Sequence, residues 1–384
     1  MTVAAVAIVG VGCAGSETSD GAGGSTSLYS TTSSAPSSSF VATPAVTACG
    51  TRQLESMTLR QKLAQLVVVG VTGAADAQAI VEREQIGGIF VGSWTDKSIL
   101  TSGAATRISK GSRIPLMVTV DQEGGRVSRL SALGIDSPSA RELAQTKTPQ
   151  QVRAIAATTG RQLRELGVTV DFAPVVDVSN ESDDEVIGDR SFSNDPAVVT
   201  EYASAYAAGL ESAGITPVFK HFPGHGHGSG DSHLGVVVTP PLSSLQNSDL
   251  VPYRTLLRDP AGAAVMVGHL IVPGLTGPET PASISPRAIG MLRTGRGYGG
   301  PPFNGVVFSD DLSGMAAISA RYPIEQAAPM AIRAGADIAL WLATDRVSSV
   351  LDSLEREVAA KRLTVARVDR SVVRILRSKG VLQC

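Results

Sequence analysis

The histidines of this sequence are concentrated in one short segment. Four of the five, His221, His225, His227 and His233, lie within thirteen residues, and the fifth is His269. An imidazole with an ordinary pKa of about 6.5 can donate and accept a proton near neutral pH, and it is also a common zinc ligand. The segment therefore predicts either proton-transfer chemistry or a metal site.

Other side chains that could do chemistry stand where short aliphatic runs end. They are Asp121, Asp177, Lys220, His221, His269, Asp310 and Asp311. A buried strand normally avoids charge at its end unless the charge is paired or functional. The same feature at several separate strands predicts one shared site.

The elements that would position these side chains alternate between short aliphatic runs and longer amphipathic stretches, which is typical of a parallel α/β sheet. Helices are expected at 149–166, 195–213 and 324–334, among others. Eight strands are expected, at 66–71, 86–92, 115–121, 169–176, 217–221, 263–269, 305–310 and 337–342. Eight such units in one domain favour a (β/α)8 TIM barrel over a doubly wound sheet, and the strand ends would then converge on one mouth.

Composition limits the class of protein. The 384 residues are 43% hydrophobic and carry a net charge of −2, with acidic and basic residues interleaved. Such a chain can bury a large core, but it offers no basic stripe for nucleic acid. No apolar run reaches the roughly 18 residues needed to cross a bilayer.

The ends of the chain suggest a secreted protein. Residues 1–13 resemble a lipoprotein signal segment with Cys13 as the lipidated residue, and residues 14–48 are rich in Ser, Thr and Gly, typical of a disordered tether. The folded domain is expected at 49–384. Cys49 and Cys384 flank it, and because the first and last elements of a barrel are neighbours, they could form a disulfide or remain two free thiols.

Several motifs follow in a fixed order along the domain. They are DQEGGRVSR at 121–129, DFAPVVDV at 171–178, GDRSF at 188–192, KHFPGHGHGSGDSH at 220–233 and FSDDLS at 308–313. In sequence and spacing they closely resemble glycoside hydrolase family 3, in its single-domain bacterial β-N-acetylglucosaminidase (β-N-acetylhexosaminidase) branch.

The resemblance implies a mechanism. Asp310 would be the nucleophile of a retaining glycosidase and form a covalent glycosyl–enzyme intermediate, with the neighbouring Asp311 pointing elsewhere. His233 would be the general acid/base, held in one tautomer by Asp231. Residues implied to bind the sugar are Asp121, Arg129, Arg190, Lys220 and His221, with supporting roles for Asp177 and His269. Arg126 is expected to be structural.

The resemblance also implies a substrate and a place of action. We expect release of non-reducing terminal GlcNAc from peptidoglycan fragments of the GlcNAc-β-1,4-MurNAc type, in cell-wall recycling, by a monomer lipid-anchored outside the cytoplasm. No metal or cofactor is expected. The chain departs from the family pattern at His227-Gly228, where Asp-Thr is usual, so contacts that close this loop are expected to differ.

Three alternatives remain open. A metal-dependent barrel hydrolase is disfavoured because the four clustered histidines share one glycine-rich segment rather than several strands. A non-catalytic saccharide-binding lipoprotein should lack Asp310 or His233, and both are present. A β-glucosidase of the same family usually carries further domains and takes its acid/base from elsewhere.

Overall fold

The computed structural model describes residues 50–260 and 262–382, which belong to one compact unit. The predictions of a signal segment with lipidated Cys13, of a tether up to residue 48 and of a Cys49–Cys384 disulfide fall on residues outside this part.

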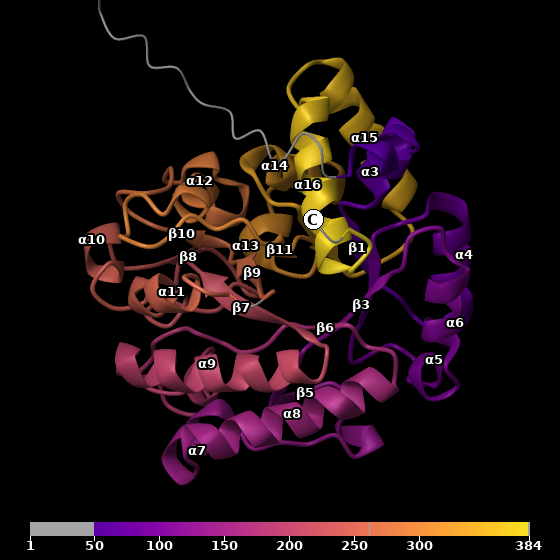
Figure 1. Cartoon of the computed structure of the whole chain (residues 1–384). Coiled ribbons are helices and arrows are strands. Elements are labelled where there is room, and N and C mark those ends of the chain that lie inside the picture. The colour runs from indigo at the N-terminus through magenta and orange to yellow at the C-terminus, as the bar shows by residue number, and fades with distance from the viewer. Residues whose placement is uncertain (1–49, 261, 383–384) are drawn as a thin grey trace, which may run out of the picture. The chain divides into compact units, whose positions relative to one another are not determined.

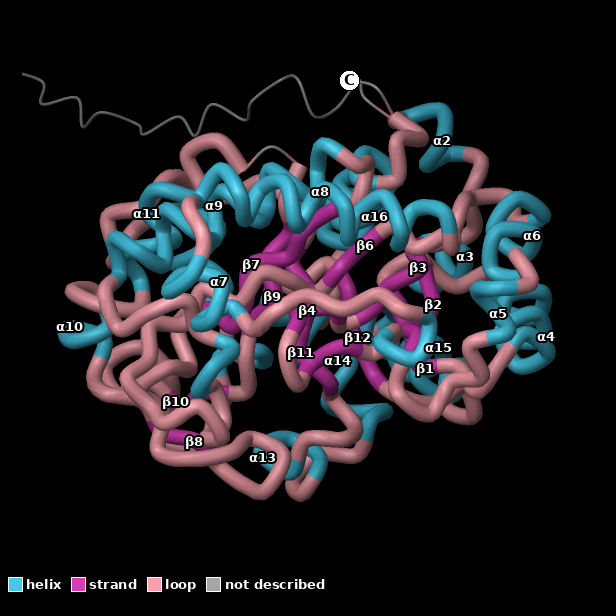
Figure 2. The backbone as a smooth tube through the Cα atoms, turned by 90° about the horizontal axis from the view of Figure 1, so that it is seen from below, coloured by secondary structure: helices cyan, strands magenta, loops and turns pink. Residues whose placement is uncertain are grey.

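The core is a closed barrel of eight parallel strands in the order β1-β12-β11-β9-β7-β6-β3-β2. The strands are β1 (Val67–Gly70), β2 (Gly88–Val91), β3 (Met117–Val120), β6 (Val170–Asp171), β7 (Thr216–Phe222), β9 (Ala264–Val267), β11 (Val307–Asp311) and β12 (Ile338–Trp341). Each lies within or within a residue of an aliphatic run identified from the sequence, so the predicted (β/α)8 fold is confirmed. Figure 2 shows the strands in the interior and helices around them.

The fourth barrel strand is much shorter than the predicted range of 169–176. Regular pairing ends at Asp171, and Pro174, which has no N–H to donate, follows shortly. Isolated contacts continue: the Phe172 N–H donates to Val120 O at 2.8 Å and the Val176 N–H to Lys220 O at 2.8 Å. The segment therefore still lies along the barrel wall and delivers Asp177 to its end.

Helices surround the barrel (Figure 1). They are α2 (Thr51–Glu55), α3 (Leu59–Ala64), α4 (Ala74–Glu84), α5 (Ser98–Thr101), α6 (Ala104–Gly111), α7 (Ala140–Thr146), α8 (Pro149–Glu165), α9 (Pro196–Ser212), α10 (Leu242–Leu245), α11 (Leu250–Leu256), α12 (Pro286–Thr294), α13 (Ala316–Ser319), α14 (Ile324–Ala334), α15 (Val347–Ala359) and α16 (Val365–Ser378). The predicted helices at 149–166, 195–213 and 324–334 correspond to α8, α9 and α14. Helix α8 starts where the sequence indicates, because Thr148 and Gln151 form a capping box ahead of Pro149.

Short elements complete the fold. Strands β4 (Gln122–Gly124) and β5 (Val127–Ser128) form a hairpin, and β8 (Val237–Val238) pairs with β10 (Leu270–Ile271). Short 3-10 turns lie at Ser131–Leu133, Gly188–Arg190 and Ala282–Ile284. The hairpin turn needs its two glycines, because Gly124 and Gly125 have φ of 96° and 52°. This explains the glycine pair of the DQEGGR motif.

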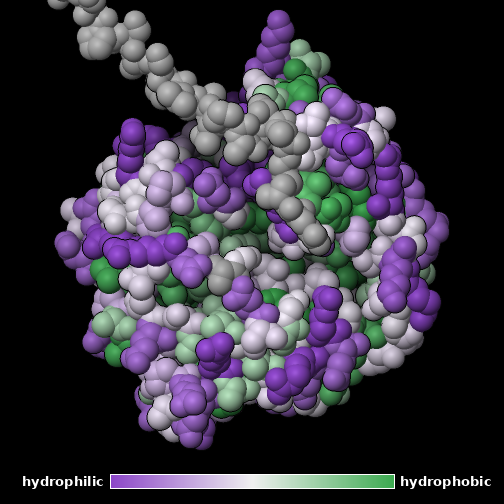
Figure 3. All heavy atoms as spheres, viewed as in Figure 1, coloured by the Kyte–Doolittle hydropathy of each residue, from purple (hydrophilic) through white to green (hydrophobic). Residues whose placement is uncertain are grey.

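No helix in the described ranges is long and apolar enough to span a bilayer. On the face drawn in Figure 3, hydrophilic side chains occupy most of the periphery. The large apolar residues that are fully buried include Trp341, Phe172 and Phe308, all in the barrel interior or its wall.

A buried ionic cluster closes the N-terminal end of β12. The Asp337 carboxylate is fully buried and accepts hydrogen bonds from Arg293, from Arg374 at 3.2 Å, from Ser371 Oγ at 2.5 Å and from the Val307 N–H at 3.1 Å. Burial by itself raises the pKa of Asp337, but the arginines outweigh it and hold the pKa below its usual range. The carboxylate therefore neutralises cations that would otherwise be buried unpaired.

Replacing Asp337 with asparagine is expected to lower the free energy of unfolding by about 3 kcal/mol at neutral pH, because it leaves buried arginines uncompensated. Since the folded pKa is depressed, the charge stabilises the fold fully above the unfolded value of about 3.9 and less as pH falls through the folded value. Urea unfolding at pH 7 and below pH 4 tests this. An equal difference between wild type and variant at both pH values would contradict it.

Candidate active site

One large cleft lies at the carboxyl ends of the barrel strands, where the sequence places the charged residues. Its volume is about 520 Å³, within the range of ligand sites. All eight residues assigned to catalysis or primary sugar binding line it: Asp121, Arg129, Arg190, Lys220, His221, Asp231, His233 and Asp310. None of these eight is missing, and the residues given only supporting roles, Asp177 and His269, lie behind the cleft wall.

Asp310 presents its carboxylate at the end of β11. It is 7% exposed, and its Oδ1 accepts the Asp311 N–H at 2.9 Å. Burial by itself raises the pKa of Asp310, but His221, His269 and Lys220 are among the groups that lower it, and the net pKa lies below its usual range. The side chain is therefore an ionised carboxylate at neutral pH, as a nucleophile requires.

The adjacent Asp311 has a different environment. Its carboxylate accepts the Ser313 N–H at 2.8 Å, the Ser313 hydroxyl at 2.9 Å and the Gly314 N–H at 2.8 Å. Burial, together with the charge of Asp310, raises its pKa. The side chain borders the cleft, but its carboxylate oxygens accept hydrogen bonds from the turn that follows β11.

A buried lysine, a half-buried arginine and two carboxylates form the floor of the cleft. Lys220 Nζ lies 2.8 Å from Asp121 Oδ1 and 2.6 Å from Glu123 Oε1, and Arg190 makes a bidentate pair with Glu123 at 2.8 and 2.9 Å. Burial raises the Glu123 pKa by itself, but Arg190 and Lys220 hold it well below its usual range. The network fixes donors and acceptors that can bind sugar hydroxyls.

The central role of Glu123 was not anticipated from the sequence. The DQEGGR motif contains it, but only the structure shows that it joins Arg190, 67 residues away, to Lys220, 97 residues away. The sequence did offer one signal. Glu123 lies two residues after Asp121, and residues two apart on an extended segment share a face.

We expect Glu123→Gln to lower kcat/KM at least tenfold, mainly by raising KM, because the two cations lose the anion that positions them. The free energy of unfolding should fall by about 2–4 kcal/mol. Steady-state kinetics and thermal unfolding measure both. Asp189→Asn is the control, because Asp189 pairs with Arg126 at 2.7 Å in an exposed position and should change stability by less than about 1 kcal/mol. A normal KM in the Glu123 variant would contradict the positioning role.

His221 is oriented from behind by Asp177. His221 Nδ1 lies 2.6 Å from Asp177 Oδ2, and Asp177 Oδ1 accepts the N–H groups of His221 and His225 at 3.2 and 2.7 Å. Burial by itself raises the pKa of Asp177, but His221 outweighs it and the net pKa is lowered. Asp177 thus leaves only Nε2 of His221 for the cleft.

His269 also acts behind the wall. Its ring nitrogens lie 2.7 Å from Ser283 Oγ and 2.7 Å from Asp311 O, and the ring is fully enclosed. It therefore braces β11 beside Asp310 and has no ring nitrogen left for a ligand.

His233 and Asp231 stand at the outer edge of the cleft. His233 Nδ1 lies 2.8 Å from Asp231 Oδ1, and the His233 side chain is 59% exposed. Burial by itself raises the pKa of Asp231, but hydrogen bonds from His233 lower it overall. The carboxylate thus fixes the Nδ1–H tautomer and leaves Nε2 open to solvent.

The turn that carries this pair is docked on the segment that follows the strand of Asp310. The Ala317 N–H donates to Ser232 O at 3.0 Å and the Ala316 N–H to His233 O at 3.4 Å, and both donors belong to α13, which follows β11. The His233–Asp231 pair and Asp310 are therefore held by the same local structure.

His227, where the sequence departs from the family pattern, lies away from the cleft lining. Its Nδ1 is 2.9 Å from Asp249 Oδ2, and this hydrogen bond, opposed by burial, raises the His227 pKa. The contact ties the segment to α11. His227 is therefore explained by its structural pair with Asp249.

The two arginines of the DQEGGRVSR motif differ. Arg126 bonds Asp189 at 2.7 Å and Ile187 O at 3.1 Å, which ties the β4–β5 hairpin to the 3-10 turn of Arg190. Both arginines line the cleft, but no hydrogen bond or ion pair joins the Arg129 guanidinium to another described residue. Arg129 is thus available to a ligand.

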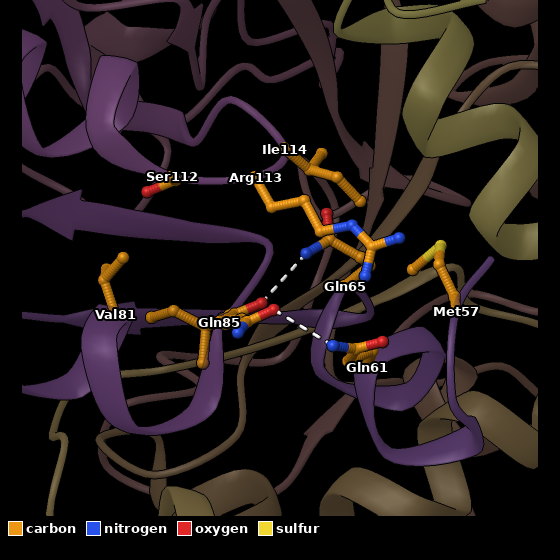
Figure 4. A pocket seen from close by; sticks show the side chains of 9 residues that line it. Met57, Gln61, Gln65, Val81, Gln85, Ser112, Arg113 and Ile114 are labelled. Carbon is orange, nitrogen blue, oxygen red and sulfur yellow. Dashed lines mark hydrogen bonds between the residues drawn. The ribbon is translucent and has the colours of Figure 1, made fainter. Parts of the chain in front are cut away.

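A second, small hollow lies at the opposite end of the barrel, where chain segments enter β1, β2 and β3. In Figure 4 the side chains of Gln61, Gln65 and Gln85 point toward one another, and Gln65 Nε2 donates to Gln85 O at 2.9 Å. The space is about 10 Å³, enough for a single water, and no acid or histidine lines it. It therefore lacks the acidic and histidine side chains that the catalytic cleft has.

Within residues 50–260 and 262–382, no three His, Cys, Asp or Glu side chains are grouped so as to hold a metal ion. His221, His227 and His233 are instead paired with separate carboxylates and His269 with Ser283, while Nδ1 of His225 has no hydrogen-bond partner among the described residues.

The fold and the cleft together define the class. A parallel eight-stranded barrel that presents an ionised carboxylate, a His–Asp pair and a polar floor at its carboxyl end has the features of a TIM-barrel glycoside hydrolase. Residues 58–378 match the model of the glycosyl hydrolase family 3 N terminal domain. The chain belongs to this family, and the resemblance seen in the motifs is confirmed.

Similar proteins indicate the branch of the family to which the chain belongs. The chain is 58% identical over 363 residues to the Beta-hexosaminidase LpqI of Mycobacterium tuberculosis, covering 93% of this chain and 92% of that protein. The structure of M. tuberculosis LpqI is similar with a TM-score of 0.83 at 60% identity, covering 84% of this chain and 94% of that one. A family 3 β-N-acetylglucosaminidase from Paenibacillus has a TM-score of 0.77 at 31% identity, covering 85% of this chain and 62% of that one. The chain is therefore an enzyme of the β-N-acetylhexosaminidase branch.

Proposed function

We propose that the enzyme is a retaining β-N-acetylhexosaminidase that removes non-reducing terminal GlcNAc from GlcNAc-β-1,4-MurNAc fragments of peptidoglycan during cell-wall recycling. The observation that carries this is one cleft in which a buried, ionised Asp310 is accompanied by a His–Asp pair with a free imidazole nitrogen. The names of the relatives, Beta-hexosaminidase and β-N-acetylglucosaminidase, support GlcNAc as the sugar that is released.

In the first step Asp310 attacks the anomeric carbon while His233 donates the Nε2 proton to the departing glycosidic oxygen. The C–O bond to the leaving sugar breaks and an ester to Asp310 forms. Before it donates this proton, His233 is an imidazolium, which the carboxylate of Asp231 stabilises. The ionised state of Asp310 and the exposed Nε2 of His233 suit these two roles.

In the second step His233, now neutral, takes a proton from water as the water oxygen attacks the anomeric carbon. The ester bond to Asp310 breaks, and the product keeps the β configuration because two inversions have occurred. Meanwhile the floor formed by Asp121, Glu123, Arg190 and Lys220 would hold the hydroxyl and acetamido groups of the sugar.

The test is hydrolysis of aryl β-N-acetylglucosaminide beside aryl β-glucoside, each with and without EDTA, with the anomer of the first product read by NMR. We expect release of GlcNAc alone, as the β anomer and unaffected by chelation. Preference for the glucoside would favour the β-glucosidase alternative, and loss of activity with EDTA restored by zinc would favour a metal-dependent hydrolase. Hydrolysis of a GlcNAc-MurNAc disaccharide tests the natural substrate.

We further propose that the enzyme is a monomer anchored outside the cytoplasm through a lipid on Cys13. Support comes from the sequence of residues 1–13 and the Ser/Thr/Gly-rich stretch after it. Cys13→Ala should move the protein from the membrane fraction to the soluble fraction, and light scattering should give the monomer mass.

A further inference from the structure

The lining of the cleft includes apolar side chains as well as the polar ones described above. Most of the polar groups come from the neighbouring strands β3, β6 and β7 and the loops that follow them, while Asp310 and Asp311 come from β11. One group of apolar side chains comes from β2 and β12, from the loops that follow β2, β11 and β12, and from the turn of the His233–Asp231 pair. They are Phe90, Trp94, Leu234, Met315, Leu340 and Leu342. The sugar-binding floor described above uses none of these apolar residues.

Trp94 is the largest exposed residue of this apolar group. Its side chain is 46% exposed, whereas Asp310 is 7% and Lys220 2% exposed. The polar floor is therefore the deep part of the cleft and Trp94 lies toward its rim. No other described residue makes a hydrogen bond with the indole N–H.

The loop that carries Trp94 is held in place by hydrogen bonds. Buried Thr95 donates its hydroxyl to Val71 O at 2.7 Å and accepts the Gly92 N–H at 3.0 Å. Lys97 Nζ donates to Gly92 O at 2.7 Å, Thr95 O at 2.8 Å and Ser93 O at 3.2 Å. An aromatic side chain on a rigid loop can bind a ligand without first losing conformational freedom.

The indole also packs on the chain beneath it. A β carbon added to Gly92 would lie only 2.4 Å from two atoms of the indole six-membered ring, so the ring rests directly over that glycine. The Trp94 and Phe90 rings are 5.9 Å apart, Phe90 and Phe172 5.8 Å, and Phe172 and Phe308 5.3 Å. A continuous row of aromatic rings thus runs from β11, the strand of Asp310, out to Trp94.

We infer that Trp94 is a specificity-determining residue that stacks against the sugar ring of the leaving group, with Leu234 completing the apolar contact. The inference rests on the proposed function and deepens it. Leu234 directly follows His233 and is 84% exposed. Because His233 must reach the glycosidic oxygen, the residues beside and outside it contact the leaving group, while the sugar bonded to Asp310 occupies the deep polar floor. The apolar face of a pyranose ring is the chemistry that an exposed indole recognises.

The test compares two substrates of the full chain that share GlcNAc as the transferred sugar: the disaccharide GlcNAc-β-1,4-GlcNAc, and GlcNAc β-fluoride, whose leaving group is too small to reach Trp94. Trp94→Ala should lower kcat/KM for the disaccharide about 10- to 100-fold, since binding energy from the leaving group is lost in the transition state. The fluoride should change by less than about twofold. Trp94→Phe should retain most of the disaccharide activity. Val365→Ala, which truncates an equally exposed apolar residue on α16, should change neither.

An equal fall in kcat/KM on both substrates would overturn the inference, because it would mean that Trp94 supports the fold or the deep site. An unchanged kcat/KM for the disaccharide would also overturn it. Binding gives a readout independent of turnover. A thio-linked, uncleavable disaccharide should alter the tryptophan fluorescence of the wild type, whereas GlcNAc alone should not, because the other tryptophan, Trp341, is 1% exposed. If the wild type cleaves neither substrate, the proposed function fails while the fluorescence result still decides the inference.

Discussion

Asp310→Asn is expected to reduce kcat by at least about 10³-fold while the protein stays folded and still binds GlcNAc. An amide cannot carry the negative charge that stabilises an oxocarbenium ion, nor can it form the ester intermediate. The depressed pKa of Asp310 means that the wild-type carboxylate remains ionised well into the acid range, so this loss should be found at every pH at which the wild type is active. Steady-state kinetics with an aryl β-N-acetylglucosaminide measures the loss.

Asp311→Asn serves as the matched comparison, because it makes the same chemical change one residue away. Its carboxylate holds Ser313 and Gly314, so we expect lower stability and a smaller fall in kcat. A fluorinated substrate that slows the second step should add one sugar mass to the peptide that contains Asp310. A larger kcat loss for Asp311, or a label on another peptide, would remove Asp310 from the role of nucleophile.

The barrel could be predicted because its strands are buried on both faces. Parallel strands in such a barrel appear in sequence as uninterrupted aliphatic runs, for example at Val67–Gly70 and Ile338–Trp341. The strand at 169–176 was predicted too long because an aliphatic run does not report pairing, and Pro174 cannot donate to a neighbouring strand. Periodicity therefore gives the existence of a strand better than its end.

The site could be predicted only in part. The topology of a parallel barrel brings strand ends to one mouth, and this was enough to gather Asp121, Lys220 and Asp310. Pairing across the barrel could not be predicted, because it depends on distances between residues far apart in the chain. The bonds of Glu123 to Arg190 and Lys220 are of this kind, and so is the exposure of Trp94, whose surroundings carry no sequence signal.

Three histidines of the clustered segment turn out to have a carboxylate partner on Nδ1. The pairs are His221–Asp177 at 2.6 Å, His227–Asp249 at 2.9 Å and His233–Asp231 at 2.8 Å. A His–Asp contact alone therefore does not identify the acid/base. The proposal of His233 rests on position: His221 is buried in the cleft wall, His227 lies outside the cleft lining, and His233 exposes its other nitrogen at the cleft edge.

His233→Ala is consequently expected to lower kcat/KM for a disaccharide about 10²- to 10⁴-fold, because the departing sugar must leave without a proton. A 2,4-dinitrophenyl glycoside, whose leaving group needs no proton, should recover most of the first step. The second step then becomes limiting, since no base activates water, and added azide should restore turnover and yield the β-glycosyl azide. Comparison of the two substrates with and without azide measures both effects.

His227→Ala is the control for this result, because it removes a histidine paired in the same way with an aspartate in the same segment. Its kcat/KM should stay within about threefold of the wild type for both substrates, with any effect appearing in stability, since the pair ties the segment to α11. If the His227 variant shows the azide rescue and the His233 variant does not, the acid/base assignment moves to His227. If neither variant is rescued, proton transfer in this cleft must come from a group other than these two histidines, and His221, whose Nε2 faces the same space, becomes the next residue to replace.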